Sequence, residues 1–87
     1  MRILEKYGIA TILYLLGKNN SMKISDIQKV LKQNTRYLYK ALEIMSENGL
    51  IKVSKETTFP FTKTVKLTDK GRRVADLLSE IERVLEE

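Results

Sequence analysis

The chain has 87 residues, 43% of them hydrophobic, and carries a formal net charge of +5. This length fits one small domain, and the apolar fraction is large enough for a core and too large for a disordered chain. Because Cys and His are both absent, disulfides, the usual zinc sites and the most common catalytic groups are excluded, and we expect no enzymatic activity, no metal site and no cofactor.

The first predicted helix spans residues 1–17 and is apolar on most of its sides. One stripe recurs near the 3.6-residue period of a helix and comprises Ile3, Tyr7, Ala10, Leu13 and Leu16. Leu4, Ile12 and Leu15 lie off that stripe, and a helix of this kind is normally buried on most sides. A small domain has little material to cover it, so we expect a second subunit on its far face, the alternative being a central core helix in a monomer. Gly17 is expected to end the helix.

A short helix is predicted over residues 25–32, after an extended piece at residues 22–24. Ser25 and Gln28 have the spacing of a capping box, which marks a helix N-terminus. Its inward stripe is expected to contain Ile27, Val30 and Leu31.

A longer helix is predicted over residues 35–48. Asn34 or Thr35 can cap its N-terminus, since both side chains carry an oxygen that accepts a hydrogen bond. Leu38, Leu42 and Met45 recur at spacings of four and three, so this side of the helix is expected to face the core.

Residues 50–67 are predicted to form a β-hairpin. Ile51 and Val53 alternate with polar residues in the first strand, and Val65 and Leu67 do so in the second, as in half-buried strands. The loop between them holds Phe59 on one side of the only Pro and Phe61 on the other. We expect these aromatic side chains to fold back on the hairpin; the alternative is an apolar wedge in a DNA minor groove.

The last helix is predicted over residues 69–86, with Thr68 as its cap and Gly71 inside it. Its apolar residues follow a heptad seam about two repeats long, which is typical of a dimer interface. The alternative is a helix packed on its own domain. Together with Leu4, Ile12 and Leu15 from the first helix, the seam gives the predicted dimer residues Val74, Leu77, Leu78, Ile81, Val84 and Leu85.

Charge is concentrated in the middle of the chain. Residues 18–73 hold thirteen Lys and Arg against five Asp and Glu, whereas residues 74–87 hold one Arg against five acidic residues. The middle therefore has the balance of an anion-binding surface, and the C-terminal segment would be repelled by phosphates. The longest charge-free run, residues 7–17, is too short to span a bilayer and no signal peptide is evident, so we expect a cytoplasmic protein with no membrane partner.

Two motifs resemble those of winged-helix transcriptional regulators. Residues 45–51, Met-Ser-Glu-Asn-Gly-Leu-Ile, are similar to the step from recognition helix into wing, and residues 67–72, Leu-Thr-Asp-Lys-Gly-Arg, to the exit from the wing in MarR-like and PadR-like bacterial and archaeal regulators. The resemblance covers nearly the whole chain. It implies a mainly helical α+β winged helix comprising a three-helix core, a two-stranded wing hairpin and a C-terminal dimerisation helix. The extra helices that build a ligand pocket in larger MarR-like proteins are absent, so no small-molecule effector is expected.

The predicted DNA-binding residues follow from this fold. The outward face of the helix over residues 35–48 would enter the major groove, where Arg36 fits guanine or a phosphate. Tyr37 and Tyr39 are expected on phosphates or thymine methyls, with support of the core as the alternative for Tyr39. Lys40 lies one turn from Arg36 on the same outward face. The remaining candidates, which suit backbone contacts, are the helix-start residues Asn34 and Thr35, then Lys23 and Lys32 before this helix and Lys55 and Lys63 beside the wing loop.

The sequence therefore predicts a homodimeric regulator that binds double-stranded DNA. Two alternatives remain: a winged-helix module for protein interaction, which predicts exposed Phe59 and Phe61, and an RNA-binding or single-strand-binding module that stacks bases on Tyr37 and Tyr39.

Overall fold

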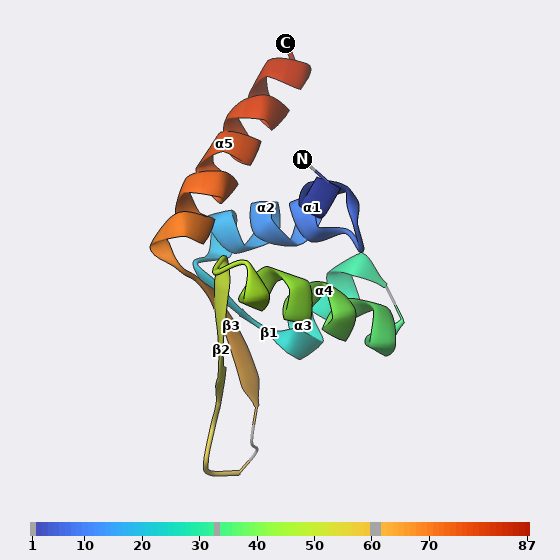
Figure 1. The fold of residues 1–87 in the computed structure, drawn as a ribbon, viewed down its shortest axis with the longest axis vertical. Helices are drawn as coiled ribbons and strands as arrows, with labels where there is room; N and C mark the ends of the chain where they lie inside the picture. Colours follow the sequence, from blue (N-terminus) through green and yellow to red (C-terminus); the bar gives the residue numbers. More distant parts are fainter. Residues whose placement is uncertain (1, 33, 60–61) are drawn as a thin grey trace.

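The structure is a computed structural model that describes residues 2–32, 34–59 and 62–87. Five helices and three strands follow one another as a mainly helical α+β fold (Figure 1). In chain order the elements are α1 (Arg2–Glu5), α2 (Ile9–Asn19), β1 (Ser21–Lys23), α3 (Ile24–Leu31), α4 (Thr35–Glu47), β2 (Ile51–Lys55), β3 (Lys63–Leu67) and α5 (Asp69–Leu85).

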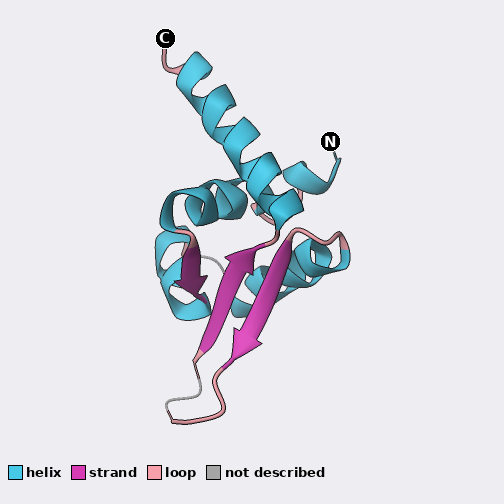
Figure 2. Ribbon diagram, turned by 90° about the vertical axis from the view of Figure 1, so that its left-hand side faces the viewer, coloured by secondary structure: helices cyan, strands magenta, loops and turns pink. Residues whose placement is uncertain are grey.

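The strands form one antiparallel sheet in the order β1-β3-β2 (Figure 2). The predicted hairpin is confirmed: β2 pairs with β3 from Ile51 opposite Leu67 to Lys55 opposite Lys63. The extended piece before α3 is a third strand, which pairs Ser21 with Lys66. The strand β1 thus lies beside the middle of β3, and the Lys55–Lys63 pair and the loop extend beyond it as the tip of the wing.

The wing is more exposed than its alternating pattern predicts. Ile51 is buried in β2, but Val53 is 43% exposed, so the expectation of an inward Val53 was wrong. The partner residue Val65 in β3 is fully buried. Because β3 lies between two strands whereas β2 is an edge strand, only the root of β2 reaches the core.

The predicted first helix is interrupted. Tyr7 and Gly8 both have positive φ, 52° and 71°, and they separate α1 from α2. Such left-handed residues cannot continue a right-handed helix. The spacing of the apolar residues did not predict this break, because it depends on which side chains are buried and not on the backbone φ angle. The interruption frees α1 to turn toward α5, as Figure 1 shows.

The end of α2 also differs from expectation. Gly17 lies inside the helix, which runs on to Asn19 and is capped by Asn20 at a φ of 65°. A Cβ at Gly17 would lie 3.0 Å from the Cβ of Ala75, so the glycine allows α2 and α5 to approach closely. Arg72 then ties the two helices together, since its guanidinium donates hydrogen bonds to the Gly17 carbonyl and to Asn20 Oδ1 at 3.0 and 2.9 Å.

The helix α3 begins at Ile24, one residue before the predicted start, and no side chain caps it. The predicted capping box at Ser25 was therefore wrong, and the Gln28 amide instead donates to Thr35 Oγ1 at 2.7 Å. Ile24 and Ile27 are buried, whereas Val30, predicted to face inward, is 55% exposed. The buried side of α3 therefore includes Ile24, which the prediction left out of the inward stripe, and excludes Val30.

The helix α4 matches its prediction closely. Asn34 is the N-cap and its side chain accepts a hydrogen bond from the Arg36 backbone N–H at 2.8 Å. The predicted inward residues Leu38, Leu42 and Met45 are all buried. The helix thus has one face fixed in the core and leaves the opposite face to solvent.

The helix α5 starts against the turn that precedes β2. Thr68 is the predicted cap: its Oγ1 accepts from the Gly71 N–H at 3.0 Å and donates to the Gly49 carbonyl. A Cβ at Gly71 would lie 1.9 Å from the Leu50 carbonyl oxygen, so this position accepts only glycine. From there α5 extends away from the body of the molecule (Figure 1).

The core lies between α2, α3, α4 and the root of the sheet. Its buried members are Ile9, Ile12, Leu13, Leu16, Ile24, Ile27, Leu38, Ala41, Leu42, Met45, Leu50, Ile51 and Val65. Within the described residues, no helix is both long and apolar enough to cross a membrane.

Candidate nucleic-acid interface

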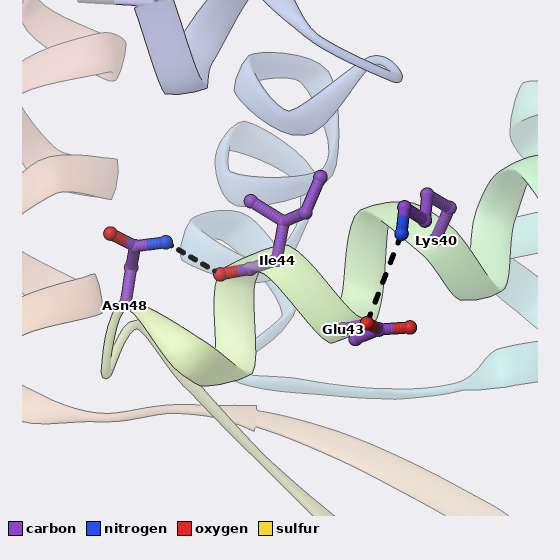
Figure 3. A network of polar contacts seen from close by, with 4 residues as sticks. All are labelled: Lys40, Glu43, Ile44 and Asn48. Carbon is purple, nitrogen blue, oxygen red and sulfur yellow. Dashed lines mark hydrogen bonds and ion pairs between the residues drawn. The ribbon is translucent and has the colours of Figure 1, made fainter.

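The outward face of α4 carries the predicted base-reading residues. Arg36 and Lys40 are exposed and lie one helical turn apart, so they share this face. Lys40 approaches Glu43 at 3.9 Å, a loose contact between two side chains that remain more than half exposed (Figure 3). An exposed pair of this kind holds its partners weakly, so both charges stay available to a ligand.

Tyr37 connects α4 to the break between α1 and α2. Its ring packs edge-on against the ring of Tyr7, with centroids 4.7 Å apart and an interplanar angle of 62°. Tyr37 is nevertheless 45% exposed. The helix break thus places Tyr7 as a support for the N-terminal half of α4, a role that helical periodicity did not reveal.

Tyr39 connects α4 to the wing. The Lys63 ammonium lies over the Tyr39 ring, 5.3 Å from its centroid. Tyr39 is 41% exposed, so it is not a core residue. The contact fixes the start of β3 beside the N-terminal half of α4 and brings residues 24 positions apart into one surface.

A groove of about 370 Å³ joins these elements, and we call it the lysine groove. It brings together Lys23 at the N-terminus of α3, Thr35 at the N-terminus of α4, and Lys63 at the start of β3. None of the described residues that line it is acidic; they are Lys23, Ile24, Ser25, Gln28, Thr35, Tyr39, Thr62 and Lys63. Two ammonium groups, several hydroxyls and two helix N-termini suit a bound phosphate.

The wing presents lysines on both of its faces. Lys55 lies opposite Lys63 on the face that meets α4, and Lys52 lies opposite Lys66 on the other. Like charges directly opposite each other destabilise a sheet, so these lysine pairs lower the stability of the wing while they raise its positive charge. Lys32, the remaining predicted phosphate ligand, is exposed at the C-terminal end of α3 and does not line the lysine groove.

A second, apolar groove lies on the opposite end of the molecule. Its volume is about 530 Å³, and it runs between α1 and α5. Leu77, Val84 and Leu85 are 65%, 56% and 74% exposed there. We call it the apolar groove, and the described residues that line it are Leu4, Val74, Leu77, Leu78, Glu80, Ile81, Val84 and Leu85.

The apolar groove contains most of the predicted dimer residues but not all of them. Ile12 is fully buried in the chain's own core and has no surface to offer a second subunit, so its assignment to a dimer interface was wrong. Leu15 is half-buried and does not line the groove. At the rim, the hydrogen bond and positive charge of Arg83 lower the pKa of Glu80.

The sequence missed several residues that shape the lysine groove. Ser25 and Gln28 were assigned to a helix cap, and Thr62 had no assigned role, yet all three line the groove. Their proximity depends on how α3 packs against β3. The sequence pattern within a single helix or strand does not predict such a contact between elements. Among the described residues, no cluster of three potential metal ligands occurs.

A family model decides the class of this protein. The model described as HxlR-like helix-turn-helix matches residues 3–87. The chain belongs to this family. The predicted winged-helix fold and the resemblance to helix-turn-helix transcriptional regulators are thereby confirmed, and no match to a curated protein was found.

Solved structures support the same fold for this HxlR-like chain. A transcriptional regulator homologue from Pyrococcus horikoshii OT3 is 26% identical with a TM-score of 0.84, over 99% of this chain and 87% of that one. FabT of Streptococcus pneumoniae, solved in complex with DNA, is 18% identical with a TM-score of 0.80, over 90% of this chain and 55% of that one. ZitR of Lactococcus lactis, a zinc-responsive MarR family member, is 28% identical with a TM-score of 0.74, over 90% and 54%. The HxlR-like chain therefore spans just over half the length of FabT and ZitR.

Proposed function

We propose that this HxlR-like protein is a homodimeric transcriptional regulator that binds a specific sequence of double-stranded DNA. The observation that carries the proposal is the lysine groove, because it joins the exposed face of α4 to Lys63 at the loop end of β3 in one basic surface. An α-helix that leaves one polar face free fits the major groove of B-DNA. The solved complex of FabT with DNA is consistent with this use of the fold.

Base recognition is assigned to α4. Arg36 lies near the N-terminus of the helix, the part that contacts base edges in helix-turn-helix proteins, and its guanidinium matches the two acceptors of guanine. Lys40 is one turn further along the same face. Tyr37 and Tyr39 flank this face and each has a ring already in contact with another residue, so we assign their hydroxyls to the DNA backbone.

Backbone contacts are assigned to the lysine groove and the wing. Lys23 and Lys63 bring two positive charges to one side of α4, and the first residues of α3 and α4, Ile24 and Thr35, line the same groove. Asn34 and Thr35 sit where α4 begins. Lys55 extends the basic surface along the wing, and Lys32 is assigned a peripheral contact.

Dimerisation is assigned to the apolar groove. The exposed residues of α5 form an apolar surface without cover from the body of the chain, and a copy of the same surface is a self-complementary partner. In such a dimer, two copies of α4 would address half-sites about 34–36 Å apart, one helical turn of DNA.

The proposal is tested by titrating the protein into labelled duplexes between 50 and 200 mM salt, roughly the range over which phosphate contacts lose most affinity. We expect tight, salt-dependent binding to duplexes selected from a random pool, and weaker binding to single strands. A protein that binds no duplex at the lowest salt would contradict the proposal. Equal affinity for single strands would favour the module that stacks bases.

A protein-interaction module is the second candidate, and one observation favours it. The side chain of Phe59 is 86% exposed, as that alternative predicts, whereas Phe61 lies outside the described residues. For Phe59 this exposure differs from the expectation that both aromatic side chains fold back on the hairpin, and for Phe61 that expectation stays a prediction. Duplex binding that is insensitive to changes in the lysine groove would support this candidate.

A further inference from the structure

The sheet has a polar face that the described helices leave uncovered. Ile51 and Val65 belong to the core, and the residues next to them in each strand point to the opposite side of the sheet. Figure 2 looks onto this opposite side, where the strands lie in front of the helices. We call it the outer sheet face, and cross-strand pairing places on it Ser21, Lys52, Ser54, Thr64 and Lys66, with Lys23 at its edge.

The outer sheet face is basic. Lys66 lies directly between Lys52 and Ser21 of the neighbouring strands, and both lysines are exposed. Among the described residues, neither lysine takes part in an ion pair. Ser54 and Thr64 add hydroxyl groups in the next row, and none of the paired positions on this face is acidic. Because like charges directly opposite each other repel, a bound polyanion would relieve the repulsion between the two lysines.

The outer sheet face is separate from the surface assigned to DNA. Lys63 contacts Tyr39 of α4 from the other face of the wing, and Lys23 also lines the lysine groove. Lys66 is three residues beyond Lys63 along β3, roughly 10 Å away at about 3.3 Å per residue, and it points to the opposite side. A duplex seated on α4 and on the loop end of the wing therefore leaves Lys52 and Lys66 uncovered.

The side chains of the outer sheet face suit phosphates and not bases. Ammonium and hydroxyl groups are the donors that proteins use on the DNA backbone. Single strands are bound by stacking their bases on aromatic rings, and none of the paired positions on this face is aromatic. This chemistry favours the outside of a duplex, where the phosphates of both strands lie close together.

We propose that the outer sheet face binds the backbone of a second DNA duplex, so that the protein bridges two duplexes. The bridge rests on the proposed function, since the first duplex occupies α4. The second duplex is bound without regard to its sequence, because phosphate contacts carry no sequence information. It is bound more weakly than the first, with a dissociation constant of roughly 1–100 µM, as is typical of nonspecific binding.

The experiment holds the first duplex, selected by the wild-type protein and carrying two half-sites, on beads, so that both copies of α4 are occupied. The beads are saturated with protein and washed, and a fluorescent duplex of unrelated sequence is added at about 50 mM salt. We expect wild-type protein to retain the fluorescent duplex and to release it as the salt concentration rises. Lys66→Glu should lower this retention about tenfold and leave the affinity for the first duplex unchanged.

The same variant separates DNA contact from folding. Lys66→Glu replaces a like-charge pair with Lys52 by a pair of opposite charges, so the melting temperature should hold or rise. A purely structural role of Lys66 would not lower retention while stability is kept. The matched control is Lys29→Glu, which makes the same change of charge at an exposed position of α3, away from the sheet. It should retain the fluorescent duplex as the wild-type protein does.

The outcomes separate the bridge from the proposed function. The bridge is overturned, and the proposed function stands, if the wild-type protein holds the first duplex and retains no second one, or if Lys66→Glu retains as much as wild type. Weaker binding of Lys66→Glu to the first duplex overturns it too, because the outer sheet face would then contact the flanks of that same duplex. A single strand retained as well as the duplex overturns the assignment to duplex DNA. Wild-type protein that binds no duplex at all overturns both proposals.

Discussion

Arg36 and Lys63 carry the same charge but are assigned different tasks. Arg36 projects from the exposed face of α4, and Lys63 lies at the loop end of β3, over Tyr39. A guanidinium offers a planar pair of donors that matches a base edge, whereas an ammonium acts as a point charge. The two residues should therefore affect specificity and affinity separately.

Replacing Arg36 by Ala is expected to relax base preference. Loss of one bidentate base contact costs about 1–3 kcal/mol on the selected duplex and little on random DNA. Fluorescence anisotropy with both duplexes measures the ratio. The matched control is Arg73→Ala, an exposed arginine of α5 that lines neither groove. Equal losses of Arg36→Ala on both duplexes would show that Arg36 only holds phosphates.

Replacing Lys63 by Ala is expected to weaken binding to all duplexes alike. The loss of one phosphate contact lowers the slope of log affinity against log salt by about 1. The control is Lys52→Ala, which removes the same charge from the opposite face of the wing. A larger change in this slope for Lys52→Ala than for Lys63→Ala would contradict the proposal, because the DNA would then contact the opposite face of the wing.

At the scale of elements, the break between α1 and α2 links two functional surfaces. Leu4 on one side of the break lines the apolar groove, and Tyr7 within it packs on Tyr37 of α4. The left-handed backbone of Tyr7 and Gly8 makes both contacts possible. The break therefore connects the proposed dimer interface to the helix assigned to DNA.

Replacing Tyr7 by Ala tests this connection. An edge-to-face aromatic pair contributes about 0.5–1.5 kcal/mol beyond its buried area, so the free energy of unfolding should fall by at least that amount. The affinity for the selected duplex should fall as well, because α4 loses a support. Urea denaturation and DNA titration measure the two effects. Tyr7→Phe keeps the ring and should recover the part of both effects that the ring contact supplies; a Phe variant as weak as Ala would contradict the ring contact.

Within elements, the sequence predicted what local chemistry controls. Side-chain type predicted Asn34 or Thr35 as the cap of α4 and Thr68 as the cap of α5; the structure has Asn34 at the first position and confirms Thr68 at the second. The start of α3 and the break at Tyr7 were not, because the same polar and apolar residues fit either backbone path. Val53 was assigned inward because alternation gives the faces of a strand but not how far the core extends.

At the scale of the whole molecule, the apolar groove predicts a second copy. Leu77→Glu places a charge in the centre of this surface and is expected to prevent dimerisation. Light scattering should give twice 10.1 kDa for the wild-type protein and 10.1 kDa for the variant. Circular dichroism should show the same helix content, since Leu77 is 65% exposed in the single chain.

The control for dimerisation is Glu82→Gln, which removes a charge from α5 outside the apolar groove. It should leave the mass unchanged. A wild-type protein of 10.1 kDa at micromolar concentration would contradict the homodimer. Leu77→Glu also separates dimerisation from DNA contact. As a monomer it should keep nonspecific DNA binding and lose tight binding to a duplex that carries two half-sites.

The sequence by itself determined the order of the elements, the face of α4 that is buried and the winged-helix class. These features depend on periodicity, caps and turn residues, all of which act over a few neighbouring positions. The tertiary structure alone decided that β1 completes the sheet, that Ile12 belongs to the core, and that Lys23, Thr35 and Lys63 share one groove. Those relations depend on how elements far apart in the chain pack together, and the spacing of residues along the sequence does not give the distance between such elements in space.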